Sequence, residues 1–398
     1  MKKISKAVSL LLSFMMAASF AACVVEEASG SSQASQTSSG KDSVLESDKE
    51  ESSVEDDSTQ KPSQGDGSSE KEEEKPEEKP EEKPEVEPTV GSVAWYLKNG
   101  YGALFQDPYI KNGVSVLSVD GGESKAIGFG TSVGSPSWTF AQWHSRYDLR
   151  NYESLKYSNK GAAYTLSSYG ANGSDGSYIP AKILKVDTTN PSIYMELNAE
   201  LEFDKPKEDG EGWPHTLLSQ DFSSNLVHVS EQKEIKAHME YNVTKFVDRM
   251  NGQGDAAKHC AQLVWYVTLQ NRTPGSEGYG QYVWFGFNLW DNRHSGDVCP
   301  EYAAQDLGKE DATQAFIYQP ASTVFFDKKR MPTVGEQTKI EFDFLPVAKQ
   351  AFELAKSRGY LPQTTWEDIY IGSMNFGWEV TGIYNVGVQI DTVGIYYK

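Results

Sequence analysis

Apolar and polar residues alternate strictly along several segments of this chain, and this period of two constrains the fold more than any other feature. From Ile193 to Asp204 every second residue is apolar, and the residues between them are mostly acidic or otherwise polar. Such alternation is typical of a β-strand with one buried face, because successive side chains point to opposite sides of a sheet. The same pattern recurs at 235–243, 263–270, 281–290, 340–344 and 386–397.

Helical periodicity is scarce in the same region. The best candidate runs from Pro346 to Arg358, with apolar residues near one face and Gly359 just past its end. Strands and helices do not alternate regularly, which argues against a doubly wound sheet and the two-lobed solute-binding proteins built on it. The sequence therefore predicts a mainly β fold, an antiparallel two-sheet β-sandwich of the jelly-roll type with one or two short helices.

The chain begins with lysines, a short apolar run, small residues and then Cys23. This order is typical of a secretory signal peptide, and the apolar run is well short of the ~20 residues that span a bilayer. Residues 20–23, Phe-Ala-Ala-Cys, resemble the lipobox of bacterial lipoproteins. The resemblance implies that residues 1–23 are a lipoprotein signal peptide with a lipid on Cys23, which anchors an extracellular protein to the outer face of the cytoplasmic membrane. The alternative is a plain signal peptide with an incidental cysteine.

Residues 24–88 contain almost no aromatic or large aliphatic side chains, so they cannot bury enough surface to fold. We expect a disordered tether, extended by prolines and by the repulsion between its carboxylates. The tether has 21 acidic residues and 7 lysines, a net charge of −14. The full chain carries −20 and the leader contributes +3, which leaves −9 for the predicted domain at 89–398. An acidic domain is unsuited to nucleic acid, because phosphate binding requires a basic surface.

Two cysteines remain in the predicted domain, Cys260 and Cys299. In an exported protein such a pair favours a disulfide. Zinc is the weaker alternative, because His259 and His294 lie nearby without a recognised ligand spacing. No cofactor or metal is predicted, although the oxygen-bearing loop at 170–176 leaves structural calcium open beside the simpler interpretation of a turn.

The segment 281–290 is unusual because its polar face is also aromatic. Its neighbour at 263–270 would add its own polar face if the two strands pair through the loop at 271–280. Aromatic rings stack on the apolar faces of sugar rings, and amides bind their hydroxyls. The alternative is that an insertion covers this face and that its tryptophans are ordinary core. The predicted ligand surface consists of Tyr266, Gln270, Tyr282, Trp284, Asn288 and Trp290.

The C-terminal stretches 376–380 and 386–398 resemble the closing strands of carbohydrate-binding jelly rolls and related concanavalin-like sandwiches. The resemblance implies both this fold and a carbohydrate ligand.

A catalytic alternative comes from residues 196–200, Glu-Leu-Asn-Ala-Glu. They are similar to the Glu-x-Asp-x-Glu strand motif of the laminarinase and xyloglucanase type of retaining glycoside hydrolase, with Asn198 in place of the aspartate. The resemblance implies that Glu196 and Glu200 are nucleophile and acid/base. Cα atoms four residues apart in a flat strand lie ~13 Å apart, so curvature must bring the carboxyls to about 5 Å. The alternative is a solvated acidic face that continues through Glu202 and Asp204.

Together these patterns predict a lipid-anchored cell-surface protein that binds a polysaccharide or oligosaccharide. It contacts the membrane only through its lipid, and nucleic acid is not a partner. Two alternatives remain open at this point: an extracellular glycoside hydrolase or polysaccharide lyase on the same scaffold, and an adhesion or structural surface protein.

Overall fold

The computed structural model of the chain describes residues 87–130, 134–190, 192–307 and 312–398. The predicted leader, Cys23 and the tether up to residue 86 lie outside the described residues, and the inferences made for them stay predictions. In the described part of the chain, no helix is long and apolar enough to cross a membrane.

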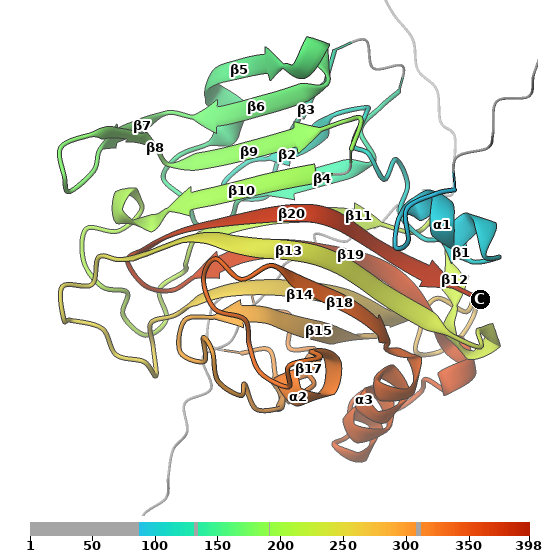
Figure 1. Ribbon diagram of the computed structural model, residues 1–398. Coiled ribbons are helices and arrows are strands. Elements are labelled where there is room, and N and C mark those ends of the chain that lie inside the picture. Colours follow the sequence, from blue (N-terminus) through green and yellow to red (C-terminus); the bar gives the residue numbers. More distant parts are fainter. Residues whose placement is uncertain (1–86, 131–133, 191, 308–311) are drawn as a thin grey trace, which may run out of the picture. The chain divides into compact units, whose positions relative to one another are not determined.

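Two large sheets form the body of the domain and face each other as layers (Figure 1). Sheet A has eight strands, of which β1 (Gly102–Ala103) pairs with β20 beside the main path. The other strands are arranged in the order β18 (Thr338–Asp343), β13 (Ile235–Asp248), β20 (Tyr384–Tyr397), β10 (Ser192–Asn198), β9 (Lys182–Asp187), β6 (Ala163–Ser168) and β5 (Tyr152–Ser158).

Sheet B has ten strands, of which β12 (Val227–His228) pairs with β19 beside the main path. Its pairs are antiparallel except β15 with β17 and β2 with β4, which are parallel. A separate small hairpin joins β7 (Gly170–Asn172) and β8 (Tyr178–Pro180). The order in sheet B is β16 (Tyr302–Gln305), β17 (Phe316–Gln319), β15 (Tyr282–Asp291), β14 (Ala261–Asn271), β19 (Ile369–Val380), β11 (His215–Asp221), β4 (Trp138–Ala141), β2 (Val114–Leu117) and β3 (Ser124–Ile127).

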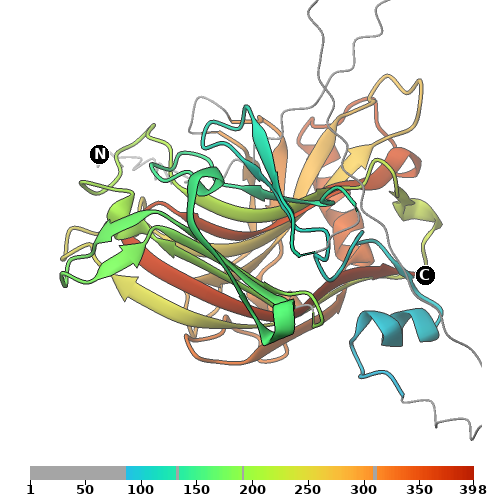
Figure 2. The same cartoon turned by 90° about the horizontal axis from the view of Figure 1, so that it is seen from above.

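The main hydrophobic core lies between the two sheets, which Figure 2 shows as two curved layers. Each long strand contributes every second side chain to it: β10 contributes Met195 and β15 contributes Phe285 and Phe287, all fully buried. A single period-two pattern thus produces both the strands and the packing of one sheet on the other. The mainly β, jelly-roll-like two-sheet sandwich predicted from the sequence is confirmed.

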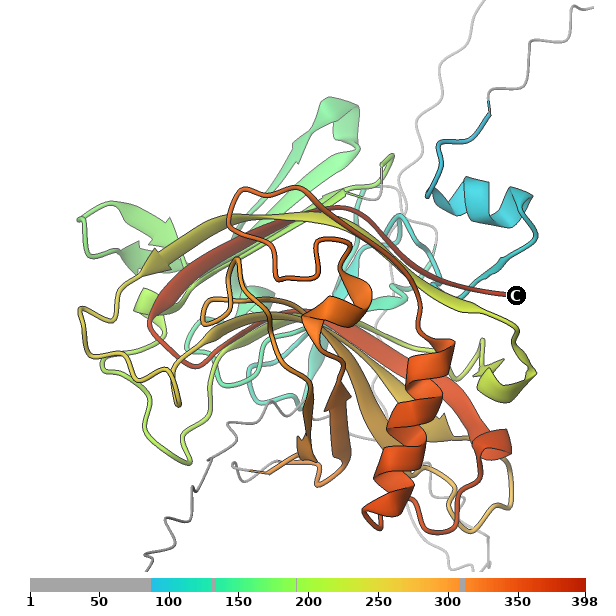
Figure 3. The same cartoon turned by 60° about the horizontal axis from the view of Figure 1, so that its bottom comes forward.

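Three α-helices occur among the described residues: α1 (Val93–Lys98), α2 (Ser322–Phe325) and α3 (Leu345–Ser357). The helix expected at 346–358 is α3, and Gly359 follows it with a φ of +87°, a left-handed conformation that favours glycine. The buried face of α3, which includes Phe352, joins the main core beside β15 (Figure 3).

The first helix joins the start of the domain to its last strand. The hydroxyl of Ser92 caps α1, and the ring of Tyr96 stacks on Tyr396 of β20 with 3.6 Å between ring centroids. His238 of β13 lies beneath, and its Nε2 is 2.9 Å from the hydroxyl oxygen of Thr392. The two residues of β1 pair with Tyr397 and Tyr396, and the backbone N–H of Leu104 donates to the carbonyl of Ile395 at 2.9 Å.

The predicted strands agree with the structure except at the end of β10. The alternation from Ile193 to Asp204 predicts one continuous strand, but β10 ends at Asn198 and a 3-10 helix covers Ala199–Leu201. The buried side chain of Glu202 explains the turn, because its Oε2 accepts a hydrogen bond from the backbone N–H of Arg146 at 2.6 Å. The acidic face expected beyond Asn198 is therefore not the face of a strand.

Candidate functional site

The predicted pairing of β14 with β15 is confirmed, with Tyr266 opposite Gly286 and Thr268 opposite Trp284. Side chains of these strands that point away from the core form what we call the outer face of sheet B. Tyr266 and Trp284 belong to a hydrophobic cluster there, separate from the main core, with 6.0 Å between their ring centroids. Tyr282 contacts Trp284 edge to face at 5.2 Å.

Trp290 does not share this face, in contrast to the prediction. The register shifts between Leu263 and Val264, so that Leu263 opposes Trp290 while Val264 already opposes Asn288. This bulge turns Trp290 into the main core, where its ring contacts Trp378 and Phe246. Trp290 therefore contributes to stability from inside the sandwich.

The remaining predicted residues are less open to solvent than expected. Tyr266, Trp284 and Asn288 are 3%, 2% and 4% exposed. Residues that follow β15 in the chain explain part of this burial, because the amide of Gln319 in β17 donates to the hydroxyl of Tyr266 at 2.7 Å and the indole of Trp284 donates to Thr313 at 3.3 Å. Two amides of the predicted surface are engaged locally: Gln270 Nε2 donates to the carbonyl of Gly280, and Asn288 Nδ2 contacts Cys299 Sγ at 3.6 Å.

The neighbouring strands β11 and β19 add polar groups that the sequence analysis missed. The Glu379 carboxylate of β19 lies opposite His215 of β11, with 3.6 Å between Glu379 Oε2 and His215 Nε2. The indole N–H of Trp213 lies 3.4 Å from the same carboxylate oxygen. The Trp143 ring packs edge-on against His215 from the other side. One carboxylate is thus held among indole and imidazole rings at the outer face of sheet B.

Asn375 lies near the centre of this face, two positions before Gly377 and four before Glu379. Its cross-strand neighbours are Tyr266 on β14 and Ser219 on β11. The side chain is fully buried, and among the described residues neither its Oδ1 nor its Nδ2 has a hydrogen-bond partner. An unsatisfied buried amide costs about 1 to 3 kcal/mol, so this side chain is placed at a cost to folding.

Two carboxylates, those of Glu379 and Asp306, place negative charge near Tyr266 on the outer face of sheet B. Burial raises the pKa of Tyr266 well above its usual value, and the negative charges of Glu379 and Asp306 raise it further. Asp306 follows β16, and its Oδ2 accepts hydrogen bonds from the backbone and hydroxyl of Thr313 at 2.8 and 2.6 Å. Tyr266 stays a neutral hydroxyl between two acidic groups.

The candidate pair Glu196 and Glu200 does not share one strand face, in contrast to the prediction, because β10 ends at Asn198. Glu196 lies on the outward side of β10 and pairs with Lys245 of β13 at 2.8 Å. Glu200 lies in the 3-10 turn, where it accepts from the backbone N–H of Ser174 at 2.9 Å and from Asn385. Burial opposes ionisation of both groups, but these partners lower both pKa values. Each glutamate has its own structural partners.

The predicted disulfide is absent from the structure, in which Cys260 and Cys299 are both free, buried thiols. The Cys260 sulfur lies 3.4 Å from Gln262 and 3.5 Å from Thr381, while the Cys299 sulfur lies next to Asn288. Burial raises the pKa of Cys260 to about 11 and that of Cys299 to about 12. Both thiols are therefore protonated and unreactive at neutral pH.

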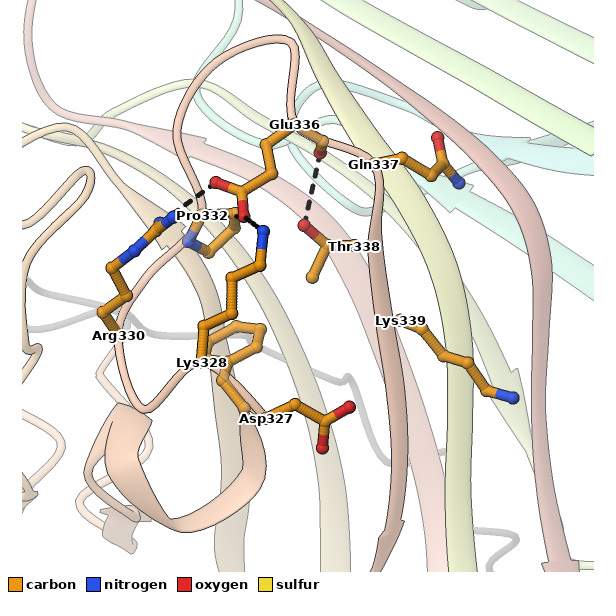
Figure 4. Close-up of a pocket in the computed structure, with 9 residues that line it drawn as sticks. Asp327, Lys328, Arg330, Pro332, Glu336, Gln337, Thr338 and Lys339 are labelled. Carbon is orange, nitrogen blue, oxygen red and sulfur yellow. Dashed lines mark hydrogen bonds and ion pairs between the residues drawn. The ribbon is translucent and has the colours of Figure 1, made fainter.

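Elsewhere in the described domain, a pocket of about 350 Å³ is lined by Glu200, Asp248 and Arg249 among other residues. The loop at 170–176 forms the β7–β8 hairpin, in which Asp175 bonds to Ser177, and no group of three His, Cys, Asp or Glu in the described residues is arranged for a metal ion. A pocket of about 180 Å³ lies beside β18 (Figure 4). Its cations Lys328 and Arg330 are neutralised by Glu336 at 2.5 and 3.0 Å.

No family model matches this chain, and no curated protein is similar to it in sequence. Solved structures with a similar arrangement include a cellulase derived from Cel12A of Rhodothermus marinus, at 11% identity and a TM-score of 0.34, covering 66% of this chain and 100% of that one. A family 12 xyloglucanase from Bacillus licheniformis is 12% identical, with a TM-score of 0.35 and coverage of 62% and 98%.

A family 11 xylanase from Neocallimastix patriciarum is 10% identical, with a TM-score of 0.31 and coverage of 62% of this chain and 95% of that one. These neighbours are glycoside hydrolases with jelly-roll folds. The sandwich of this chain is established by its own strand pairing, and likenesses at these TM-scores carry no conclusion about its activity.

Proposed function

We propose that this protein binds a polysaccharide chain at the outer face of sheet B. The observation that carries the proposal is the buried amide of Asn375, beside Tyr266 and without a hydrogen-bond partner in the described part of the chain. Neighbouring hydroxyls of a sugar ring offer the donor and acceptor that an amide needs, and the C–H face of the ring stacks on an aromatic side chain. Tyr282, which is partly exposed, supplies an aromatic contact, and Tyr266 and Trp284 pack behind it.

The charges of the site favour a neutral polysaccharide. The negative charges of Glu379 and Asp306 both raise the pKa of Tyr266. The imidazole of His215 already lies opposite Glu379 and is paired with it. An anionic polymer would meet like charges at this face and across a domain with a net charge of −9. The same charges argue against nucleic acid as a partner.

Affinity electrophoresis of the Cys23→Ser chain tests the proposal. Gels contain a soluble 1,4-β-glucan, xyloglucan, xylan or, as the anionic arm, alginate. We expect retardation by at least one neutral polysaccharide and loss of that retardation in Asn375→Leu. Asn242→Leu, on β13 of the other sheet, is the matched control and should migrate as the parent chain does. Retardation by none of the neutral polymers, or equal retardation of Asn375→Leu, contradicts the proposal.

A second candidate function is hydrolysis of the bound chain, and the setting of Glu379 favours it. Its carboxylate lies near the indole N–H of Trp213 and the imidazole of His215, and Asp306 is a second carboxylate near Tyr266. Glycoside hydrolysis uses two such groups, one acid and one nucleophile or base. Release of reducing ends that disappears in Glu379→Gln, with retardation in the gel retained, would establish this activity; its absence leaves the binding function.

The proposed location is the cell surface. The lipobox-like residues before Cys23 and the acidic tether at 24–88 support a domain held by a lipid at the outer face of the cytoplasmic membrane. Capture of an external polymer is a use for a domain on such a tether.

A further inference from the structure

Lys182 is unusual for a lysine, because its side chain is fully buried. It starts β9 in sheet A, and its ammonium lies 3.7 Å from the carboxylate of Glu202, which is also buried. Moving an ammonium and a carboxylate out of water costs several kcal/mol per ion, and apolar residues of similar volume often stabilise a fold as well or better. Stability alone therefore does not explain this pair.

The pair holds one short segment that follows β4, residues 142–149. The Lys182 ammonium donates to Gln142 Oε1 at 3.2 Å and also to the hydroxyl of Ser145 and the carbonyl of Tyr147. Glu202 accepts from the Ser145 hydroxyl at 2.7 Å and from the backbone N–H of Arg146 at 2.6 Å. Bonds to the buried pair thus lie on both sides of residues 143 and 144.

Residues 143 and 144 are the part of this segment that reaches the candidate site. The ring centroids of Trp143 and His144 lie 5.7 and 6.1 Å from that of His215, whose imidazole faces Glu379. His144 has a φ of +53°, a conformation that costs energy in a residue other than glycine and persists only where its surroundings hold it. The network around Lys182 supplies part of that hold, beside the backbone hydrogen bonds that the N–H of His144 donates to Val119 and the N–H of His215 donates to Trp143.

We propose that the buried Lys182–Glu202 pair is a positioning device that fixes Trp143 and His144 against His215 and so shapes one wall of the polysaccharide site. The proposal rests on the proposed function. Lys182 and Glu202 reach the site only through the 142–149 segment, so they are positioning residues and not catalytic ones. Figure 1 shows β9 in the layer in front of β4, so the pair connects sheet A to the site carried by sheet B.

The protonation of Lys182 gives the device a pH dependence. Burial lowers the pKa of Lys182 to about 8, although the charges of Glu202 and Asp148 oppose this effect. Asp148 is itself paired with Arg150 at 2.7 Å, and Arg146 with Asp204 at 2.6 Å, so these guanidinium groups are already engaged. Above pH 8 the ammonium loses its proton, and its attraction to Glu202 is lost with it.

Hydrogen–deuterium exchange of the full Cys23→Ser chain tests the proposal without any polysaccharide. Lys182→Met removes the hydrogen bonds from Lys182 to the 142–149 segment but leaves the Glu202 carboxylate buried without its cation. The double variant Lys182→Met, Glu202→Gln is therefore measured beside the single variant, because it leaves no unpaired buried charge and preserves folding. We expect amides of the 142–149 segment to exchange at least tenfold faster in the double variant, with β14 and β19 unchanged. Lys185→Met, an exposed lysine of the same strand, is the control and should exchange as the parent chain does.

Two further readouts separate positioning from plain stability. In the parent chain, exchange of this segment corrected for intrinsic rates should rise between pH 7 and pH 9, and in the double variant it should not. Retardation by a soluble 1,4-β-glucan, hydroxyethyl cellulose, should weaken at least tenfold in the double variant. If the parent chain is not retarded by this polymer, the result counts against the glucan as ligand, and the exchange data still decide the positioning role. Unchanged exchange in the 142–149 segment, or an equal increase across the whole domain, overturns it.

Discussion

Replacing Asn375 by leucine should make the domain more stable while removing its ligand binding. The side chain is fully buried, and its amide oxygen and nitrogen both lack partners among the described residues. Leucine has nearly the same shape without the unsatisfied polar atoms. The penalty for burying an unpaired amide is about 1 to 3 kcal/mol, so the free energy of unfolding should rise by about that amount. For a domain of this size, the melting temperature should increase by roughly 2 to 6 °C.

Asn271 provides the opposite case for the same substitution. It is also fully buried and lies at the end of β14, but its Nδ2 donates to Ser276 at 2.9 Å and to Thr364 at 3.0 Å. Asn271→Leu leaves Ser276 and Thr364 without this hydrogen-bond donor and should lower the melting temperature. Differential scanning calorimetry of both variants beside the parent chain decides the matter. A destabilised Asn375→Leu, with a melting temperature near that of Asn271→Leu, would refute the reasoning that Asn375 is held for a ligand.

Three other predictions follow from features described above. Trp290→Ala should lower the free energy of unfolding by about 3 to 5 kcal/mol in chemical denaturation, because it empties part of the core; a loss below 1 kcal/mol would mean that the bulge does not bury this ring. Burial lowers the pKa of His238 to about 4, so the folded state resists its protonation. The contribution of neutral His238 to the free energy of unfolding is complete above about pH 6.5 and is lost as the pH falls toward 4, by up to about 3 kcal/mol. His238→Gln should flatten this part of the plot of unfolding free energy against pH. An unchanged plot would contradict the assignment of this pH dependence to His238. Cys23→Ser should move the protein from the membrane fraction to the medium, which immunoblotting of the fractions would detect; unchanged membrane retention excludes the lipid anchor.

The period-two pattern was sufficient to predict the sandwich, six of the twenty strands that the described residues form, and the β14–β15 pair. It failed where a local irregularity changed the direction of side chains. Nothing in the alternation of 281–290 marks the extra residue that turns Trp290 inward, because a bulge depends on the register with the partner strand. The end of β10 was missed for a similar reason, since the contacts of Glu202 come from a distant segment.

The candidate site was predicted only in part because it is assembled from strands far apart in the chain. Alternation around Trp378 could have placed Asn375 and Glu379 on the face opposite the core. The sequence could not show that His215 lies beside Glu379, because the two residues are 164 positions apart and meet only through the pairing of β11 with β19. The buried Lys182 looks in the sequence like any surface lysine of a strand.

The junction between α1 and β20 determines how the domain would respond to a pulling force on its proposed tether. With the proposed lipid anchor and polysaccharide ligand, a load between polymer and membrane would enter the domain at its first described residues, where α1 and the two-residue β1 meet the last strand, β20. The ladders of β13 with β20 and of β14 with β19 are much longer than the two-residue pairing of β1 with β20. Detaching residues 88–103 would lengthen the proposed connection to the membrane by up to roughly 50 Å at ~3.4 Å per residue, while sheet A would lose only β1 and the site on sheet B would remain intact. We therefore expect this junction to open under load before the site releases the polymer.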